Sequence, residues 1–586
     1  MSSTIQNESE AARALVHEGW NHLMSQRPLA AWGTWQRALR VDPDSAAASS
    51  ALATLKSAPE LPLAARKTHR FRQPRDQARR ARWDALLRSA PLEELDAAAD
   101  VFAELVREAP DDVEAWFNRG LCLAWRGRDR EAVDALDRVV ALEADHNPEG
   151  AVEAWTLAEI LRQGGGAETL ADDLRYACGF PWDDAETPNL SIRFPEIRRI
   201  PTPRDPTNHE AKTPNLEVLE WLDRPFPDVA PESTSAAELP RVLATIYITP
   251  GSIRLSSPRV DGLEEAEEKL RLLIGHDAKA TERAAAPLPL PFLDAAVWTV
   301  RFPEGRERAD AERWSREVVE DYYENRWIHR PRQGLDGLSP LAAARDARAG
   351  DDVARAKLSA VIRLREQLGA RPSSTVLYQG YPFDRLRRRL GLDPIDPASV
   401  DSADLSCASL WEIQGLSPGE LEDQPLVEAF LSALGLWDDE LTVNLARELL
   451  NRRPEGIRRV SAPDLIAALV RLETRRDRPD SALEWIDQVE PLANVAQRRT
   501  LQTWRAEILA RSDRPDEAAA IYRALLDDSP DDAPLALDAA ETLLDNLHVD
   551  HARPFLNIAV RLAGPLGLRG VASRAARHLE TTGSEP

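Results

Sequence analysis

Residues 113–145 read VEAWFNRGLCLAWRGRDREAVDALDRVVALEAD, and this stretch decides how the rest of the chain is interpreted. Each half carries small or apolar residues at spacings of four and three, which places them on one face of a helix. These residues are Trp116, Gly120 and Leu123 in the first half and Ala132, Leu136 and Val139 in the second. The polar segment 126–129 separates the halves. We therefore expect two short amphipathic helices that pack against each other and against a neighbouring element.

This spacing resembles the tetratricopeptide repeat, a helix-turn-helix unit of about 34 residues with Trp, Gly and Ala at set positions. Ala98 precedes Ala132 by 34 positions, and Ala518 precedes Ala552 by the same interval of 34. Small residues are needed where two helices approach closely, and large residues where a gap must be filled. The resemblance implies a stacked helical array that binds other proteins rather than one that catalyses a reaction.

Related patterns near both termini predict a mainly α fold, with tetratricopeptide-like helical arrays at both ends and a small α+β module in the middle. The residues assigned to the repeat scaffold are Gly19, Ala31, Trp35, Trp116, Gly120, Ala132, Leu136, Ala518, Tyr522, Pro530 and Ala552. We expect the N-terminal array at 11–180 and the C-terminal array at 463–579. The last residues, 580–586, are expected to form a disordered tail.

Composition narrows the class of partner. The 586 residues include 98 acidic and 74 basic side chains, a formal net charge of −24, which disfavours nucleic acid and anionic membranes as partners. The three cysteines, Cys122, Cys178 and Cys407, are isolated, so we expect neither disulfides nor a bound metal. We see no signal peptide and no apolar run of membrane-spanning length. We therefore expect a cytoplasmic protein, and its wealth of Ala, Arg, Asp and Pro is typical of high-GC bacterial genomes.

The centre of the chain contains a proline-rich segment, which is followed by a segment of alternating apolar residues. Segment 181–240 holds eleven prolines, which is typical of a linker. Phrases in it such as PTPRDPT could instead adopt the polyproline II conformation and bind other proteins. The alternating sequence VLATIYIT at 242–249 then precedes Pro250 and Gly251, which suit a type II turn. This pattern predicts a β-hairpin that opens the small α+β module at 241–370.

A distinctive run of residues lies near the end of the predicted module. It comprises Trp327, Pro331, Leu335, Gly337, Ser339 and Pro340. Ser339 is a good helix N-cap, and Pro340 suits the first helical position. Together with the hairpin, this run resembles a bacterial domain found beside the zinc-binding tail module of the SecA translocase. Its second part is similar to the toxin-binding domain of Xre/MbcA/ParS-type antitoxins, which implies regulatory binding.

Segment 371–462 gives a weaker signal, and we expect a mostly helical connector there. Two basic runs, 66–88 and 385–389, fit either a phosphate-binding groove or basic faces, solvated or paired internally with acidic helices. The acidic overall charge favours the second interpretation. His329 lies among charged residues just before a proline, and this context favours a surface or capping role over acid–base catalysis.

The sequence contains no phosphate-binding loop, no His-Glu-x-x-His motif and no Gly-x-Ser-x-Gly motif. We therefore expect no catalytic residue, no cofactor and no metal. The favoured hypothesis is a non-enzymatic scaffold whose concave helical surfaces bind protein segments. Gln502 and Arg505, near Trp504, are the candidate partner contacts. The alternatives are a regulatory protein that binds nucleic acid or a toxin through the middle module, and an enzyme with an unrecognised site between domains.

Overall fold

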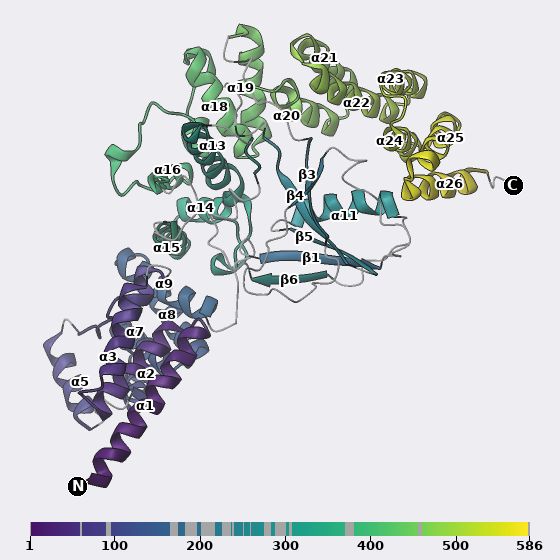
Figure 1. The fold of residues 1–586 in the computed structure, drawn as a ribbon. Helices are drawn as coiled ribbons and strands as arrows, with labels where there is room; N and C mark the ends of the chain where they lie inside the picture. The colour runs from purple at the N-terminus through teal and green to yellow at the C-terminus, as the bar shows by residue number, and fades with distance from the viewer. Residues whose placement is uncertain are drawn as a thin grey trace.

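The computed structural model has the predicted mainly α fold, with helical arrays at both ends and a small β-sheet in the middle (Figure 1). The structure describes residues 2–58, 61–74, 76–89, 95–164, 174–181, 196–200, 217–225, 236, 239–249, 251–257, 260–274, 283–287, 300–303, 307–369, 380–454, 457 and 460–583.

Most helices of the N-terminal array pack on a neighbour in the chain, and some also pack on helices more distant in sequence. The helices of this array are α1 (Ser2–Met24), α2 (Pro28–Val41), α3 (Ala46–Ser57), α4 (Leu63–Arg66), α5 (Gln77–Ser89), α6 (Leu95–Glu108), α7 (Val113–Trp125), α8 (Asp129–Glu143) and α9 (Pro148–Gly164). α6 packs on α7, α7 on α8 and α8 on α9. Each helix thereby buries its apolar stripe against its neighbours, as expected for a solenoid.

The hairpin of α7 and α8 shows why small residues recur. A Cβ atom on Gly120 would lie 2.9 Å from Cγ of Leu136, so a larger residue would force the helices apart. Ala132 and Leu136 are fully buried in this interface. Trp116 is half-buried, and its Nε1 donates a hydrogen bond of 3.0 Å to the carbonyl of Pro110. The close approach thus depends on Gly120, while the indole fixes the loop before the hairpin.

Gly19 and Trp35 make a similar contact between α1 and α2. A Cβ atom on Gly19 would overlap the indole of Trp35. Trp35 is fully buried, as is Ala31 one turn earlier in α2. Its Nε1 donates a hydrogen bond of 3.1 Å to the carbonyl of Val16, which satisfies the buried polar atom.

One turn geometry recurs between paired helices. The residue just beyond the first helix has a positive φ, and the next amide donates to a carbonyl five residues earlier. This is the hydrogen bond of a Schellman cap. The residues with positive φ are Gln26, Gly127, Gly350, Trp437, Asp477, Asp513 and Leu547. The turn therefore identifies two hairpins that the sequence pattern had not assigned to an array, one at 340–369 and one at 423–452.

The C-terminal array consequently begins earlier than residue 463. Its helices are α18 (Asp423–Gly435), α19 (Asp439–Arg452), α20 (Ala462–Arg475), α21 (Pro479–Val489), α22 (Val495–Arg511), α23 (Pro515–Asp528), α24 (Ala533–Asp545), α25 (Val549–Leu566) and α26 (Arg569–Gly583), with the short helix η10 (Glu490–Leu492) before α22. α18 pairs with α19, which packs on α20, so the second half of the expected connector 371–462 belongs to the array. The expected disordered tail is also corrected, because α26 reaches Gly583; residues 584–586 lie outside the described part.

Between the arrays, the described residues form an antiparallel six-stranded sheet of order β2-β3-β4-β5-β1-β6. Its strands are β1 (Leu174–Pro181), β2 (Ile197–Arg199), β3 (Glu217–Leu222), β4 (Val242–Thr249), β5 (Ser252–Ser257) and β6 (Arg283–Pro287). The predicted hairpin is β4 and β5, in which Ile246 pairs with Leu255. Helix α11 (Val260–Ile274) covers one face through Leu263, Ala266 and Leu270, which join the apolar core of the sheet.

The expected linker at 181–240 is corrected by this sheet, because it contributes β2 and β3. Leu219 of β3 pairs with Ile246 of β4, and the neighbouring Trp221 is buried in the core of the sheet. The prolines of this segment flank β3 rather than interrupt it, which a strand tolerates. The stretch PTPRDPT, at 201–207, lies outside the described residues.

The helices after the sheet pack back onto the N-terminal array. They are α13 (Arg308–Asp321), the π-helix η4 (Tyr322–Arg326), η5 (Trp327–His329), η6 (Gln333–Leu335), α14 (Pro340–Arg348) and α15 (Asp352–Gly369). α15 packs along α9, and Arg363 binds Glu149 across this contact at 3.0 Å. The expected module 241–370 is thus corrected at both ends. The sheet unit spans 174–287, and α14 and α15 extend the helical stack.

Further elements connect this region to the C-terminal array, namely α16 (Phe383–Arg389), η7 (Pro397–Ser399), α17 (Leu410–Gln414) and η8 (Pro418–Glu420). The end of the C-terminal array also returns to the sheet unit, because α26 packs on α11. A Cβ atom on Gly570 would overlap the backbone carbonyl of Arg271, so glycine permits this contact. The sheet unit is therefore held at its helix by the last helix of the chain.

We predict that Gly120→Leu destabilises the N-terminal array by about 1–3 kcal/mol, because the new side chain must displace Leu136. The matched control is Gly564→Ala in α25, where an added Cβ meets nothing within 4 Å. That control should be neutral or stabilising by up to about 1 kcal/mol. Chemical denaturation followed by circular dichroism measures both. Equal unfolding midpoints for the parent and Gly120→Leu would show that the assigned interface is wrong.

Candidate binding groove

A hollow of about 600 Å³ lies between α20 and α22, the first helices of two successive hairpins. It is lined by Asp439, Ala467, Val470, Arg471, Thr474, Arg475, Trp504, Glu507, Ile508 and Arg511. First helices of successive hairpins line the same face of a helical solenoid, and such faces form extended binding surfaces. We call this hollow the α20–α22 groove.

The groove combines apolar walls with charged groups. Trp504 is half-buried beside Val470 and Ile508, so much of the indole is available within the hollow. Asp439 binds Arg471 at 3.0 Å and also binds Arg475, which holds two guanidinium groups at one side. Binding sites generally combine an apolar lining with a few polar groups. The groove therefore suits a peptide in which an apolar side chain is flanked by polar groups.

Glu507 and Arg511 lie one helical turn apart on α22 and complete the groove. The side chain of Glu507 is exposed, and partial desolvation by the surrounding protein raises its pKa. A carboxyl group with a raised pKa gains from a hydrogen-bond donor or a cation supplied by a ligand. Glu507 therefore adds a polar contact point beside Trp504.

Gln502 and Arg505, the expected partner contacts, have partners within the chain. Gln502 donates to Glu490 at 2.5 Å, and Arg505 binds both Glu490 at 3.1 Å and Asp487. Both side chains thus tie α22 to α21 and η10 rather than line the groove. The other residues of α22 that line the groove lie about one turn from Trp504, at 507 and 508, and about two turns from it, at 511.

The remaining scaffold residues of the C-terminal array belong to α23, to α25 and to the turn between α23 and α24. Ala518 and Ala552 are fully buried. Tyr522 is also buried, and its hydroxyl donates to Oγ1 of Thr542 at 3.3 Å. Pro530 differs from them because it is exposed in the turn between α23 and α24.

The middle motif builds the turn that leads into α14. Trp327 and Leu335 are buried, and the hydroxyl of Ser339 accepts a hydrogen bond from the amide of Ala342 at the start of α14. Pro340 occupies the first turn of that helix. Gly337 has a φ of +83°, which favours glycine, and Pro331 is exposed. The motif thus serves packing and helix capping.

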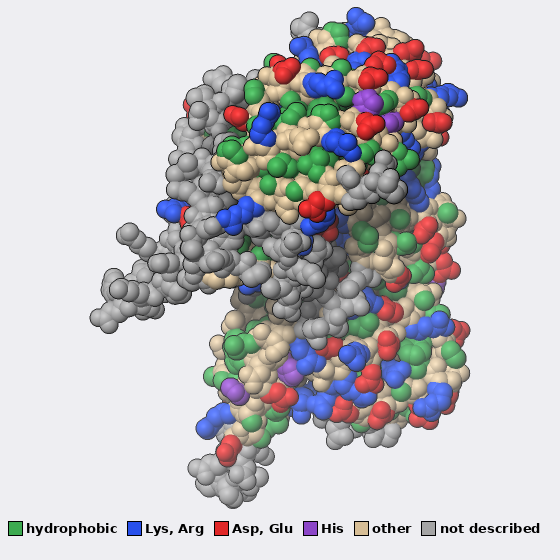
Figure 2. All heavy atoms as spheres, turned by 90° about the vertical axis from the view of Figure 1, so that its right-hand side faces the viewer, with side chains coloured by type: hydrophobic (Ala, Val, Ile, Leu, Met, Phe, Trp, Pro, Cys, Tyr) green, Lys and Arg blue, Asp and Glu red, His purple; other side chains and the backbone are tan. Residues whose placement is uncertain are grey.

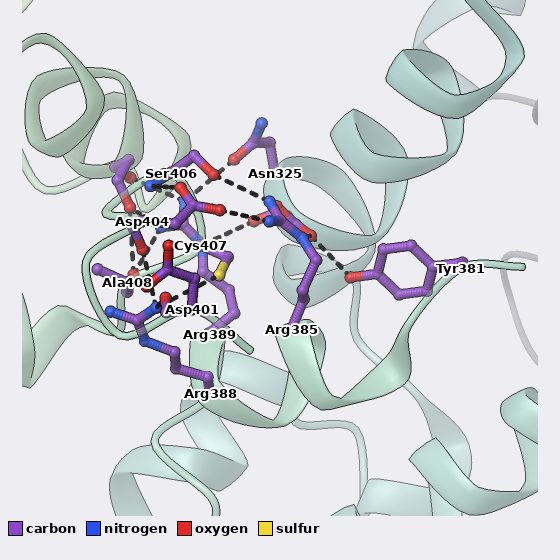
Figure 3. Close-up of polar contacts among 12 residues, drawn as sticks. Asn325, Tyr381, Arg385, Arg388, Arg389, Asp401, Asp404, Ser406, Cys407 and Ala408 are labelled. Atoms are coloured by element: carbon purple, nitrogen blue, oxygen red, sulfur yellow. Dashed lines mark hydrogen bonds and ion pairs between the residues drawn. The ribbon is translucent and has the colours of Figure 1, made fainter. Parts of the chain in front are cut away.

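The second basic run is buried in a polar network (Figure 3). Arg385 of α16 donates to both carboxylate oxygens of Glu324, at 2.8 and 3.0 Å, and to Asp404 at 2.6 Å. The hydroxyl of Tyr381 donates to Glu324 at 2.9 Å. Burial alone would lower the pKa of Arg385, but hydrogen bonds and the charge of Glu324 raise it. We call this cluster the Arg385 network.

Arg389 extends the network to α18. Its guanidinium is fully buried and donates to the carbonyls of Ala408 and Ser432 at 2.8 Å each and to that of Glu324 at 3.0 Å. Burial lowers the pKa of Arg389 to about 10. Since backbone carbonyls fix this side chain, it joins the π-helix, the loop before α17 and the C-terminal array. The basic run 385–389 is therefore paired internally.

The first basic run is also engaged by acidic helices. Arg72 binds Glu143 at 2.8 Å and Glu153 at 3.3 Å, and it lies 3.8 Å from the ring centroid of Phe117. Arg79 binds Asp112 at 2.5 Å. These contacts favour the interpretation that the run 66–88 stabilises the array rather than binds phosphate groups.

His329 stacks on Trp437, with ring centroids 3.8 Å apart and planes 1° from parallel. Its Nε2 donates to the carbonyl of Gly435 at 2.7 Å. Burial lowers the pKa of His329, so the neutral ring is favoured near pH 7. These contacts give His329 a role in closing the α18–α19 turn.

The thiols are poor candidates for chemistry. Cys122, Cys178 and Cys407 are buried thiols. Burial raises the pKa of Cys122 to about 12 and that of Cys407 to about 11, so both thiols stay protonated near neutral pH. In the part of the chain that the structure describes, no three His, Cys, Asp or Glu side chains gather in an arrangement that could hold a metal ion. None of the described helices is both long enough and apolar enough to cross a membrane.

These features define a helical-repeat protein in which stacked hairpins are interrupted by an inserted sheet. Residues 114–146, which span the hairpin of α7 and α8, match the tetratricopeptide repeat family. This hairpin is thus similar to that repeat, in line with the resemblance drawn from Trp116, Gly120, Ala132 and Leu136. No curated protein matches the chain.

Two solved structures illustrate the comparison at the level of whole chains. The crystal structure of yeast Tom70 is 12% identical, with 98% of this chain and 96% of that chain covered and a TM-score of 0.23. The crystal structure of the P58(IPK) TPR domain is 14% identical, with 86% of this chain and 98% of that chain covered and a TM-score of 0.17. These TM-scores are too low to support an argument about this chain.

We predict that Arg385→Met costs about 3–5 kcal/mol, because it leaves the buried carboxylate of Glu324 without its guanidinium partner. The matched control is Arg82→Met, which breaks an exposed ion pair with Glu108 and should cost about 0–1 kcal/mol. Urea denaturation of the intact protein compares the two. Similar small losses would contradict the structural role of the Arg385 network.

We predict a pH dependence at Asp384, near the same network. Partial burial opposes the effect, but the amides of Ile395 and Asp396 donate to the carboxylate at 2.9 and 3.0 Å and lower the pKa of Asp384. Because the pKa is lower in the folded state, this carboxylate stabilises the fold above the unfolded value of about 3.9. That contribution disappears as the pH falls through the folded pKa. The urea midpoint of Asp384→Asn should therefore lie below that of the parent at pH ~7 and approach it under strongly acidic conditions; an equal difference at both would contradict this assignment.

Proposed function

We propose that this protein is a non-enzymatic scaffold that binds a segment of a partner protein in the α20–α22 groove. The observation that carries this proposal is the half-buried Trp504 in a hollow of about 600 Å³ on the face formed by first helices. Aromatic side chains in partly enclosed pockets are the residues that most often dominate protein interfaces. The match of residues 114–146 to the tetratricopeptide repeat supports a helical-repeat scaffold in general.

A protein partner is favoured over nucleic acid by charge. The chain carries a formal net charge of −24, and the arginines described above in both basic runs bind carboxylates or carbonyls of the same chain. A nucleic-acid site would need cationic side chains that are available to phosphates. A protein segment needs only the apolar and polar walls of the groove. We infer a cytoplasmic setting in a bacterium from composition and from the buried thiols of Cys122, Cys178 and Cys407.

The regulatory alternative through the middle motif is less favoured. Trp327 and Leu335 are buried, and Ser339 caps α14, so these side chains are committed to packing. A toxin-binding role would have to use other residues of the region. The enzymatic alternative would need a nucleophile or an acid–base pair, and the groove offers Glu507 and Thr474 beside arginines without such a pair.

We predict that Trp504→Ala weakens partner binding by about 2 kcal/mol or more, roughly 30-fold, because it removes the aromatic wall of the groove. Thr474→Trp should block the same groove by filling it. Gln502→Ala is the matched control, since Gln502 lies two residues from Trp504 but contacts Glu490 instead. The measurement is capture of host proteins by the intact chain after nuclease treatment, quantified by mass spectrometry.

The expected result is a set of proteins lost with both groove variants and retained with Gln502→Ala. Capture that is identical for the parent and both groove variants would refute the proposed site. Capture of nucleic acid that vanishes at moderate salt would instead support the regulatory alternative.

A further inference from the structure

A second hollow lies on an edge of the C-terminal array, away from the groove. Its volume is about 690 Å³, and it is formed where the turn between α23 and α24 meets the turn between α25 and α26. The lining residues are Ser529, Pro530, Asp531, Asp532, Pro534, Pro565, Leu566 and Leu568. None of them lines the α20–α22 groove, which is formed by residues 439–511. We call this hollow the edge pocket.

The walls of the edge pocket are apolar and stiff. Pro530, Pro534 and Pro565 are among the residues that line it. A proline side chain has little conformational entropy to lose when a ligand binds. Leu566 is 38% exposed at the mouth, and Gly567 follows with a φ of +66°. Such a preformed apolar hollow is suited to receive one apolar side chain.

Acidic residues line the edge pocket at Asp531 and end the helix α23 that leads into it at Asp527 and Asp528. Asp527, Asp528 and Asp531 are exposed, and in the part of the chain that the structure describes none of the three forms a salt bridge. Asp532 has structural partners, because it caps α24 through the amide of Leu535 and also binds Arg499. One of the three carboxylates, that of Asp531, therefore lines the hollow, and the other two lie at the end of the helix that leads into it.

Two of these carboxylates lie at the C-terminal end of a helix, where a negative charge is electrostatically unfavourable. Asp527 and Asp528 end α23, whose last turn has no basic residue. The C-terminal end of a helix carries a partial negative charge, so acidic side chains there are locally unfavourable. A cationic ligand would relieve this repulsion. Figure 2, which faces this end of the molecule, shows acidic, basic and apolar side chains mixed over the upper lobe.

We infer that the edge pocket binds a basic peptide segment that places one apolar side chain in the hollow and its Lys or Arg residues against Asp527, Asp528 and Asp531. The apolar anchor supplies affinity through burial, and the charges supply orientation and speed of association. This surface is separate from the groove, so the scaffold can hold two segments at once.

The test begins with selection of a phage-displayed library of random short peptides on the intact protein. The selection is repeated on Asp528→Asn/Asp531→Asn. The peptides enriched on the parent are then synthesised with a fluorophore and titrated by fluorescence polarisation. We expect parent-specific peptides with net positive charge and an apolar residue, and about tenfold weaker binding to the double variant.

Two control variants locate the binding. Asp477→Asn/Asp513→Asn makes the same change in charge at the turns of the opposite edge and should leave the affinity unchanged. Trp504→Ala alters the groove and should also leave it unchanged, which separates this inference from the proposed function. Asp528→Asn/Asp531→Asn should unfold at a temperature close to that of the parent, because Asp528 opposes the C-terminal end of α23 whereas Asp531 favours the N-terminal end of α24.

The inference is overturned by any of three results. One is the absence of enriched peptides on the parent. Another is enrichment of neutral or acidic peptides only. The third is binding of the basic peptides that survives Asp528→Asn/Asp531→Asn or is lost with Trp504→Ala, since the peptide would then occupy another surface.

Discussion

The stacked hairpins depend on a single backbone constraint, the residue of positive φ that closes each first helix. Glycine meets this constraint at positions 127 and 350, and Asp477 and Asp513 meet it in the C-terminal array. Trp437 and Leu547 meet it too, although a large side chain in this conformation costs on the order of 1–2 kcal/mol. The packing of the hairpins must exceed this cost. Once the turn is set, the second helix returns at an angle that brings small residues of one helix against large residues of the other.

The inserted sheet interrupts this stack in sequence but not in space. Helix α15 packs on α9 although the sheet unit lies between them in the chain, and α26 packs on α11 of that unit (Figure 1). The Arg385 network then joins the π-helix to α18 through Arg389 and Glu324. The groove and the edge pocket therefore lie on one connected framework. A ligand that bridges both would benefit from their fixed separation rather than from new contacts.

Local patterns could be predicted from the sequence, and long-range ones could not. The α7–α8 hairpin was predictable because each of its helices carries small or apolar residues at spacings of four and three. These are Trp116, Gly120 and Leu123 in α7 and Ala132, Leu136 and Val139 in α8. The α18–α19 hairpin was missed because Trp437 occupies the turn position of positive φ. Glycine is the residue that usually marks this position in a sequence. β2 and β3 were hidden by flanking prolines, and no pattern links α9 to α15. Trp504 indicated helix α22, but Gln502 is about 200° around that helix from Trp504, so its side chain contacts Glu490 instead of the groove.

The most direct test of the continuous stack is a cross-link between α9 and α15. Glu149→Cys and Arg363→Cys introduce two thiols at the ion pair that joins these helices, whereas the three native cysteines are buried. A short bismaleimide should link them within one chain, and tryptic peptides from both helices should be joined in the mass spectrum. Each single-cysteine variant is the control. If only intermolecular or single-site adducts form, the helices after the sheet belong to a separate domain, and the account of one interrupted array is wrong.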